Sequence, residues 1–335
     1  MEMRTLGRTG VKVSPLCLGC MMFGGRTEPE PSYDIIDKAI DAGLNFLDTA
    51  NVYTRGRSEE VTGEALKRNG KRDSIVLATK VHGRMADDDP NMLGNTRRHI
   101  IQQCDASLKR LQTDWIDLYQ IHRPQSDIPI DETLRALDDL VRQGKVRYIG
   151  TSTYAAWQLV EALWVAERFG LNRFICEQPP YHLLDRRIER DLLPMSRTYG
   201  NAVIPWSPLA GGFLTGKYRR GQQPPADARI KQDDGPRGSA FFTDATFGKV
   251  EALEALAAEK GCTFSQFALA WCMHQPGVTS PIIGPRTMER LEDNLGALTV
   301  EITDADREKI DAIVEPGRAT VPYYNADFGP HPMRV

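Results

Sequence analysis

The feature of this sequence that most constrains its fold is a regular alternation between short apolar runs and longer stretches with helical spacing of apolar residues. Short runs that lead into helical stretches are typical of parallel strands joined by helical crossovers. The predicted strands cover residues 13–19, 44–47, 75–78, 116–121, 146–150, 174–177, 202–206 and 280–283. The predicted helices cover residues 33–42, 58–68, 96–111, 131–142, 155–168, 191–199, 247–259, 265–274 and 288–295. The eight predicted strands therefore indicate the α/β class and a closed (β/α)8 TIM barrel rather than an open doubly wound sheet.

The length of 335 residues would also suit two domains of about 150 residues each. Because the repeats continue through most of the chain, we instead expect one barrel domain over residues 1–335. Residues 3–13, with Arg8-Thr9-Gly10 at their centre, precede the repeats and predict a small N-terminal β-hairpin.

Two later segments interrupt the alternation. Residues 219–245 are rich in Gly and Pro and lack apolar periodicity. We expect them to form a long, irregular loop after strand seven, over the C-terminal face of the barrel. The chain beyond Pro316 is an irregular tail whose aromatic side chains pack either across the barrel mouth or on an outer helix. These side chains are Tyr323, Tyr324, Phe328 and His331.

Charge and cysteine content exclude several classes of protein. Lys and Arg total 42 against 45 for Asp and Glu, so the net charge of −3 gives no sign of a nucleic-acid or anionic-membrane surface. The first twelve residues lack the apolar core of a signal peptide, and we expect no membrane span and a cytoplasmic location. Six cysteines are too few for a disulfide scaffold, and Cys17 and Cys20 form an isolated CxxC pair with an incidental role. The sequence predicts no metal site.

One motif is a false signal. Gly211 to Lys217 has the spacing of a phosphate-binding loop, but Tyr218 follows where such a loop needs Ser or Thr.

Four polar side chains follow three consecutive predicted strands. Asp48 ends strand two and Tyr53 comes just after it, Lys80 follows strand three, and His122 follows strand four. Catalytic residues of such barrels lie at the C-terminal ends of strands. We therefore expect these four residues to form the catalytic site.

These side chains suit the delivery of a proton to a carbonyl oxygen. A tyrosine hydroxyl, with an ordinary pKa near 10, is a poor proton donor unless a nearby ammonium favours the phenolate. A carboxylate beside the ammonium keeps it charged, and a histidine could orient the carbonyl. No side chain supplies a hydride, so the reaction would need a bound nicotinamide.

The same residues carry a resemblance that extends over most of the chain. The sequence resembles the aldo-keto reductase superfamily, and its long loop after strand seven makes it more similar to the bacterial and potassium-channel-β-like branch. The motifs are Asp48-Thr49-Ala50 with Tyr53, Ala78-Thr79-Lys80, Tyr119-Gln120-Ile121-His122-Arg123, Gly144-Lys145-Val146-Arg147-Tyr148-Ile149-Gly150, Glu177-Gln178-Pro179-Pro180-Tyr181 and Trp206-Ser207-Pro208-Leu209-Ala210-Gly211-Gly212.

The resemblance implies a role for each matching residue. Tyr53 would be the proton donor, tuned by Lys80 and Asp48, and His122 would orient the substrate carbonyl. NADP(H) is the implied cofactor, because Arg286 and Arg290 would suit the phosphate of the adenosine ribose. The implied cofactor-binding residues are Gly19, Cys20, Met21, Asp48, Ser152, Gln178, Trp206, Ser207, Leu209, Gly211, Lys217, Gly284, Arg286, Arg290 and Asn294. Thr153 stands where many relatives have Asn, which alters part of the expected carboxamide contact.

Reduction of an aldehyde or ketone is therefore the expected activity. Its partner would be a small-molecule carbonyl such as a keto-sugar, an aromatic aldehyde or a xenobiotic ketone, and a homo-oligomer is compatible with the sequence. Two alternatives stay open. One is a redox-sensing regulatory subunit that binds NADPH and turns over slowly. The other is a Schiff-base lyase that uses Lys80, although Asp48 would keep that amine charged.

Overall fold

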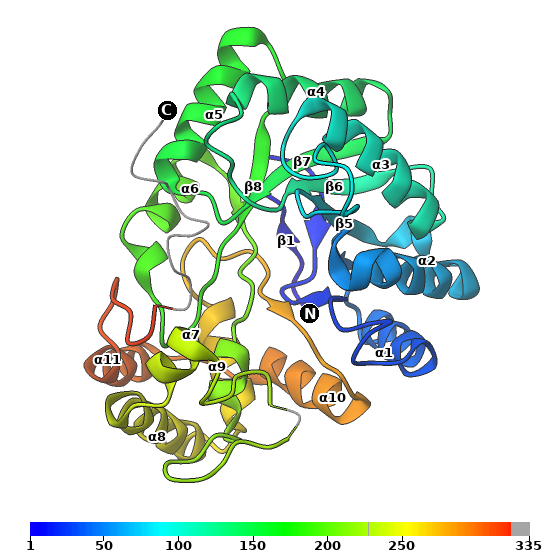
Figure 1. Cartoon of the computed structure of the whole chain (residues 1–335). Helices are drawn as coiled ribbons and strands as arrows, with labels where there is room; N and C mark the ends of the chain where they lie inside the picture. Colours follow the sequence, from blue (N-terminus) through cyan, green and yellow to red (C-terminus); the bar gives the residue numbers. More distant parts are fainter. Residues whose placement is uncertain (227, 323–335) are drawn as a thin grey trace.

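The computed structural model describes residues 1–226 and 228–322, and its core is a barrel of eight parallel strands surrounded by helices (Figure 1). The spatial order of the strands is β10-β3-β4-β5-β6-β7-β8-β9. Their bounds are β3 Cys17–Gly19, β4 Phe46–Asp48, β5 Val76–Val81, β6 Ile116–Ile121, β7 Val146–Ser152, β8 Phe174–Gln178, β9 Ala202–Val203 and β10 Ile282–Ile283. The predicted (β/α)8 barrel is confirmed.

The barrel closes between the seventh and eighth parallel strands, β9 and β10. The amide of Thr279 donates to the carbonyl of Val203 at 2.7 Å, and the amide of Ile282 donates to the carbonyl of Pro205 at 2.8 Å. This seam is short because β9 ends at Val203, although the sequence predicts a strand over residues 202–206. Pro205 has no amide hydrogen to continue the strand, so only its carbonyl takes part in the closure.

The helices enclose the barrel and follow the predicted pattern with two additions. They are α1 Pro29–Asp41, α2 Arg57–Asn69, α3 Arg97–Leu111, α4 Ile130–Arg142, α5 Ala156–Phe169, α6 Leu192–Tyr199, α7 Gly235–Phe241, α8 Asp244–Glu259, α9 Phe264–Met273, α10 Met288–Gly296 and α11 Asp304–Ile313. Helices α7 and α11 are absent from the sequence prediction. In the part of the chain that the structure describes, no helix has the length and apolar content needed to cross a membrane.

The N-terminal hairpin, also predicted, closes the bottom of the barrel. It pairs β1 Arg4–Thr5 with β2 Lys12–Val13 in antiparallel register. Leu6 is fully buried among residues of the barrel interior such as Phe46 and Leu118. Val13 belongs to this hairpin rather than to the first barrel strand, because Pro15 interrupts the run predicted over residues 13–19.

The segment 219–245 is only partly a loop. It contains helix α7, and its aromatic residues pack on the turn after β9. The rings of Phe213 and Tyr218 stack with centroids 4.1 Å apart, and the Tyr218 hydroxyl accepts a hydrogen bond from the amide of Ile230 at 3.1 Å. The prediction of a long, irregular loop is therefore wrong for residues 235–241, which form α7, and the ring of Phe241 packs with its centroid 4.6 Å from that of Phe213.

The tail residues singled out from the sequence, Tyr323, Tyr324, Phe328 and His331, lie outside the described residues. The prediction of a single domain over residues 1–335 stays a prediction.

Candidate active site

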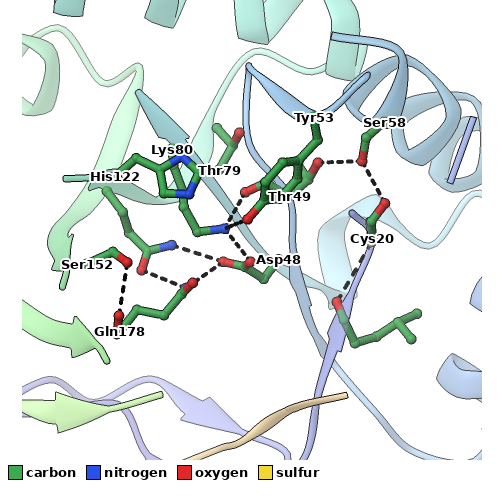
Figure 2. A network of polar contacts seen from close by, with 12 residues as sticks. Cys20, Asp48, Thr49, Tyr53, Ser58, Thr79, Lys80, His122, Ser152 and Gln178 are labelled. Atoms are coloured by element: carbon green, nitrogen blue, oxygen red, sulfur yellow. Dashed lines mark hydrogen bonds and ion pairs between the residues drawn. The ribbon is translucent and has the colours of Figure 1, made fainter. Parts of the chain in front are cut away.

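Four polar side chains converge at the C-terminal end of the barrel, as Figure 2 shows. Asp48 is the last residue of β4, Lys80 lies in β5, and His122 directly follows β6. Tyr53 begins a short 3-10 helix, η1 Tyr53–Gly56. Because these strands are neighbours in the sheet, the barrel brings together the four residues that the sequence predicts as catalytic.

A buried ion pair forms the centre of this cluster. Lys80 is fully buried, and its Nζ donates to Asp48 Oδ2 at 2.5 Å and to the Thr49 carbonyl at 2.8 Å. Burial opposes the charged ammonium, but Asp48 and Tyr53 outweigh that effect and hold the pKa of Lys80 above its usual value. Lys80 is therefore a permanent positive charge inside the barrel.

Tyr53 lies against this charge. Lys80 Nζ donates to the Tyr53 hydroxyl at 3.3 Å and lies 4.9 Å from the centroid of the ring. The two residues after Tyr53 adopt left-handed backbone conformations, with φ of 48° at Thr54 and 53° at Arg55. Such conformations are costly for residues other than glycine and are typical of functional sites, where packing holds them in place. The turn thus directs the phenol into the site.

His122 faces the tyrosine from the next strand. The centroids of the two rings are 5.6 Å apart, and the rings meet edge to face at 84°. Burial, together with the positive charges of Lys80 and Arg123, holds the pKa of His122 well below its usual value. The imidazole is therefore neutral near pH 7 and can donate one hydrogen bond.

Two buried amides occupy the other side of Asp48. Its Oδ1 accepts hydrogen bonds from Gln120 Nε2 at 3.0 Å and Gln178 Nε2 at 2.9 Å. The Gln178 amide nitrogen also lies 3.1 Å from Gln120 Oε1. Ser152, paired with Gln178 across β7 and β8, donates from its hydroxyl to the Gln178 backbone carbonyl at 2.9 Å.

Asp48, Tyr53, His122, Ser152 and Gln178 line a cavity of about 680 Å³. Every residue predicted to contact a cofactor lines this cavity except Cys20, whose side chain is fully buried beneath it. The backbone amide of Cys20 donates to the carbonyl of Asp48 at 2.8 Å. The lining residues from that prediction are Gly19, Met21, Asp48, Ser152, Gln178, Trp206, Ser207, Leu209, Gly211, Lys217, Gly284, Arg286, Arg290 and Asn294.

The lining of the cavity suits an anionic ligand. Lys217, Arg286 and Arg290 line it together with Gly284, where a Cβ atom would meet no other atom within 4 Å. The loop after β9 contains successive left-handed residues, including Gly211 at φ 66° and Gly212 at φ 105°. Cations attract phosphate groups, and glycine lets a phosphate group approach the backbone closely.

Several residues of the site escape prediction from the sequence. Gln120 lies two positions before His122, so strand alternation places both on one face and could have identified it. Arg26 and Arg229 also line the cavity, but they lie in loops whose paths no periodicity predicts. Val52, in the loop after β4, also lines the cavity.

Comparisons with known proteins extend the similarity to nearly the whole chain. The model of a family described as "Aldo/keto reductase family" matches residues 15–315. An uncharacterized oxidoreductase, YrpG, of Bacillus subtilis (strain 168) is 40% identical over 312 residues, covering 90% of this chain and 92% of that protein. Proteins named probable voltage-gated potassium channel subunit beta are 38% identical in Oryza sativa subsp. japonica and 36% identical in Arabidopsis thaliana. Each of these two matches covers 94% of this chain and 97% of the relative.

Proposed function

The chain belongs to the aldo/keto reductase family, and from that premise we propose that it is an NADP(H)-dependent reductase of aldehydes or ketones with Tyr53 as proton donor. The family consists of oxidoreductases that act on carbonyl compounds. The observation that supports the finer proposal is the Tyr53 hydroxyl lying 3.3 Å from a buried ammonium at the wall of a cavity of about 680 Å³.

The proton is delivered by groups of the chain itself. A carbonyl carbon that receives a hydride leaves a negative charge on its oxygen, and the Tyr53 O–H transfers its proton to that oxygen. The phenolate that remains is stabilised by the Lys80 ammonium, which Asp48 holds in place and keeps charged. His122, being neutral, donates an N–H to the same oxygen and orients the carbonyl without placing a second cation beside Lys80.

The cofactor is proposed to lie in the same cavity. Reduced nicotinamide, when bound, supplies the hydride that no side chain can supply. Gln178 and Ser152 would hold its carboxamide, and Trp206 would cover its ring. The turn at Gly211 would lie over the pyrophosphate. Lys217, Arg286 and Arg290 give the far end a positive charge suited to the additional phosphate that distinguishes NADP(H) from NAD(H).

Apolar side chains and an arginine line the part of the cavity that we assign to the substrate. Met22, Val52 and Trp206 line it beside the Tyr53 hydroxyl, and Arg123 lies at the same wall with its guanidinium carbon 6.0 Å from the centroid of the Trp206 ring. This lining suits a partly apolar carbonyl compound of moderate size, such as an aromatic aldehyde or ketone.

The proposal is tested by replacing the proton donor. With NADPH and a panel of aldehydes and ketones, Tyr53→Phe is expected to lower kcat by about 100- to 10,000-fold, because the general acid is lost while the ring remains. The absorbance of the reduced nicotinamide follows the reaction. Tyr199→Phe makes the same change at an exposed position on α6 and should leave kcat unaltered. Turnover that survives Tyr53→Phe would remove Tyr53 from its proposed role.

A second function is favoured by the names of two relatives. The Oryza and Arabidopsis proteins are named as probable potassium channel subunits beta, so a regulatory subunit that binds the nucleotide and turns over slowly is the alternative proposal. Nucleotide binding in the micromolar range or tighter, without measurable turnover on any carbonyl of the panel, would support this alternative.

The lyase alternative receives no support from the site. A Schiff base requires an uncharged amine as nucleophile. The raised pKa of Lys80 and its bond to Asp48 keep the ammonium protonated. Borohydride treatment in the presence of a carbonyl substrate should therefore leave Lys80 unmodified.

A further inference from the structure

Gln120 is a polar residue of the barrel interior to which neither the motifs nor the proposed mechanism gives a role. It lies in β6, is fully buried, and pairs in register with Lys80 on one side and Gly150 on the other. A Cβ atom at Gly150 would lie 3.3 Å from Gln120 Cγ and 2.4 Å from Cys176 Sγ. The glycine thus leaves the space into which the Gln120 side chain extends.

The charge of Lys80 determines which way the neighbouring amides point. The ammonium donates to Asp48 Oδ2, so Asp48 is an ionised carboxylate that can only accept hydrogen bonds. The two amide groups that meet Asp48 Oδ1, those of Gln120 and Gln178, must therefore turn their NH2 groups toward it.

Gln120 then completes the anchoring of Gln178. One N–H of the Gln178 amide is directed to Asp48 Oδ1, and the nitrogen also lies 3.1 Å from Gln120 Oε1, which accepts the other N–H. Both amide hydrogens of Gln178 are used within the barrel wall. The oxygen, Oε1, is the amide atom left for the cavity that Gln178 lines.

The geometry points to Gln120 as a positioning residue that fixes the amide of Gln178 with its oxygen toward the cavity, so that the site accepts an N–H from the carboxamide of a nicotinamide. This role rests on the proposed function, because it needs a nicotinamide nucleotide as ligand. It also connects the cofactor end of the site to the ion pair beside Tyr53, since Asp48 Oδ1 receives both amides while Asp48 Oδ2 receives Lys80.

The orientation of the Gln178 amide can be tested without any turnover by comparing the binding of two nucleotides. In the 3-acetylpyridine analogue of NADP⁺ a methyl group replaces the carboxamide NH2, so the analogue keeps the carbonyl and loses the donor. The wild-type protein should bind the analogue about tenfold more weakly than NADP⁺, because the buried Gln178 oxygen is left without a partner. The ratio of the two dissociation constants is the quantity to compare between variants.

Gln120→Leu removes both contacts of the Gln120 amide and fills the same space with an apolar side chain. Without Gln120 Oε1 the Gln178 amide is held at one point and can rotate, so the ratio should fall below about threefold. Gln103→Leu is the matched control. Gln103 is also a buried glutamine, but it lies on α3 and accepts from Asn51 Nδ2 at 3.2 Å, away from Asp48. This control should keep the wild-type ratio.

The outcomes separate this role from the proposed function. An unchanged ratio in Gln120→Leu, or an equal fall in Gln103→Leu, would overturn the role of Gln120 even if the enzyme reduces carbonyls. A wild-type ratio near one would overturn it as well, because the nucleotide would then not sense the Gln178 oxygen. Failure of the wild-type protein to bind either nucleotide would instead overturn the proposed function. If Gln120→Leu does not fold, Gln120→Met, with an unbranched side chain of similar length, carries the same expectation.

Discussion

Asp48 is only 2% exposed, and its carboxylate accepts hydrogen bonds from Lys80, Gln120 and Gln178. One oxygen receives the Lys80 ammonium and the other receives two amides. In a medium of low polarity such a group is stable only while its partners remain, since an isolated buried charge costs several kcal/mol. At the scale of the residue, the geometry of the site therefore depends on the ion pair as much as on the tyrosine it supports.

Removal of Lys80 should damage stability and activity together. Lys80→Met keeps the length of the side chain but leaves Asp48 as an uncompensated buried charge, and a loss of about 3 kcal/mol in the free energy of unfolding is expected. The value of kcat should fall about 100-fold or more, because the phenolate of Tyr53 loses its stabilising charge. Denaturant titration and NADPH consumption measure the two effects.

Lys71→Met is the matched control for this change. Lys71 forms an exposed ion pair with Asp41, and such pairs contribute at most about 1 kcal/mol. A Lys80→Met protein as stable and as active as Lys71→Met would show that the buried pair has no such role.

The sequence predicted the four catalytic candidates for a physical reason. In a parallel barrel the ends of consecutive strands meet at one face, so Asp48, Lys80 and His122 had to lie close together once their strands were assigned. Gln120 could be found in the same way from strand alternation. Arg26 and Arg229 could not, because the path of a loop depends on tertiary contacts that sequence spacing does not encode.

Among the elements, the N-terminal hairpin packs closely against the barrel. Gly7 has φ of +57°, and a Cβ atom there would lie 2.4 Å from the carbonyl oxygen of Ile175 in β8. A side chain at this position would meet backbone, which cannot move aside as the end of a flexible side chain can. The hairpin therefore seats Leu6 in the barrel interior only because residue 7 is glycine.

Gly7→Ala should consequently destabilise the protein by about 1–3 kcal/mol, through both the strained φ and the clash. Gly10→Ala lies in the same hairpin, where a Cβ would meet nothing within 4 Å, and should change stability by less than about 0.5 kcal/mol. Thermal unfolding of the two variants under one condition makes the comparison. Equal midpoints would show that the hairpin does not press against β8.

The bounds of the barrel strands were harder to predict than their number. Apolar runs identify buried strands, but they do not show that Pro205 ends β9 after Val203 or that Val13 pairs within the hairpin. Helix α7 was missed since its segment lies among Gly and Pro residues and lacks a helical period. Local composition suggested a loop there. In the structure Phe213 stacks on Tyr218 and also packs against Phe241, the last residue of α7.

For the molecule as a whole, a buried acid makes stability depend on pH. Glu177 is fully buried beside Gln178, and its carboxyl accepts hydrogen bonds from the Thr151 hydroxyl at 2.5 Å and the Tyr154 amide at 3.0 Å. Burial raises the pKa of Glu177 to about 8 despite these donors. Because the folded value lies above the unfolded one, this group stabilises the protein fully below about pH 4.5, and that contribution is lost as the pH rises to about 8.

Glu177→Gln should remove this dependence, since an amide does not titrate. The free energy of unfolding of the variant, minus that of the wild type, should rise by about 2–4 kcal/mol between pH 5 and pH 8 and then level off. Denaturant titrations at pH 5, 7 and 9 would measure it. Glu30→Gln, at an exposed position, should show a change below about 0.5 kcal/mol over the same range. A difference that is flat or falls with pH would exclude a raised pKa for Glu177.

The short seam of the barrel also limits when a growing chain can fold. Val203 and Pro205 bond to residues 279 and 282, and the Arg4 guanidinium donates to the carbonyls of Met273 and Thr279, which lie 269 and 275 positions further along the chain. Contacts over such separations form slowly, because a long loop must close before they contribute stability. During synthesis the N-terminal hairpin cannot complete its contacts until the last barrel strand has been made, and the barrel cannot close before then. Until then the half-formed sheet exposes two strand edges, and that interval is when the protein most needs protection from aggregation.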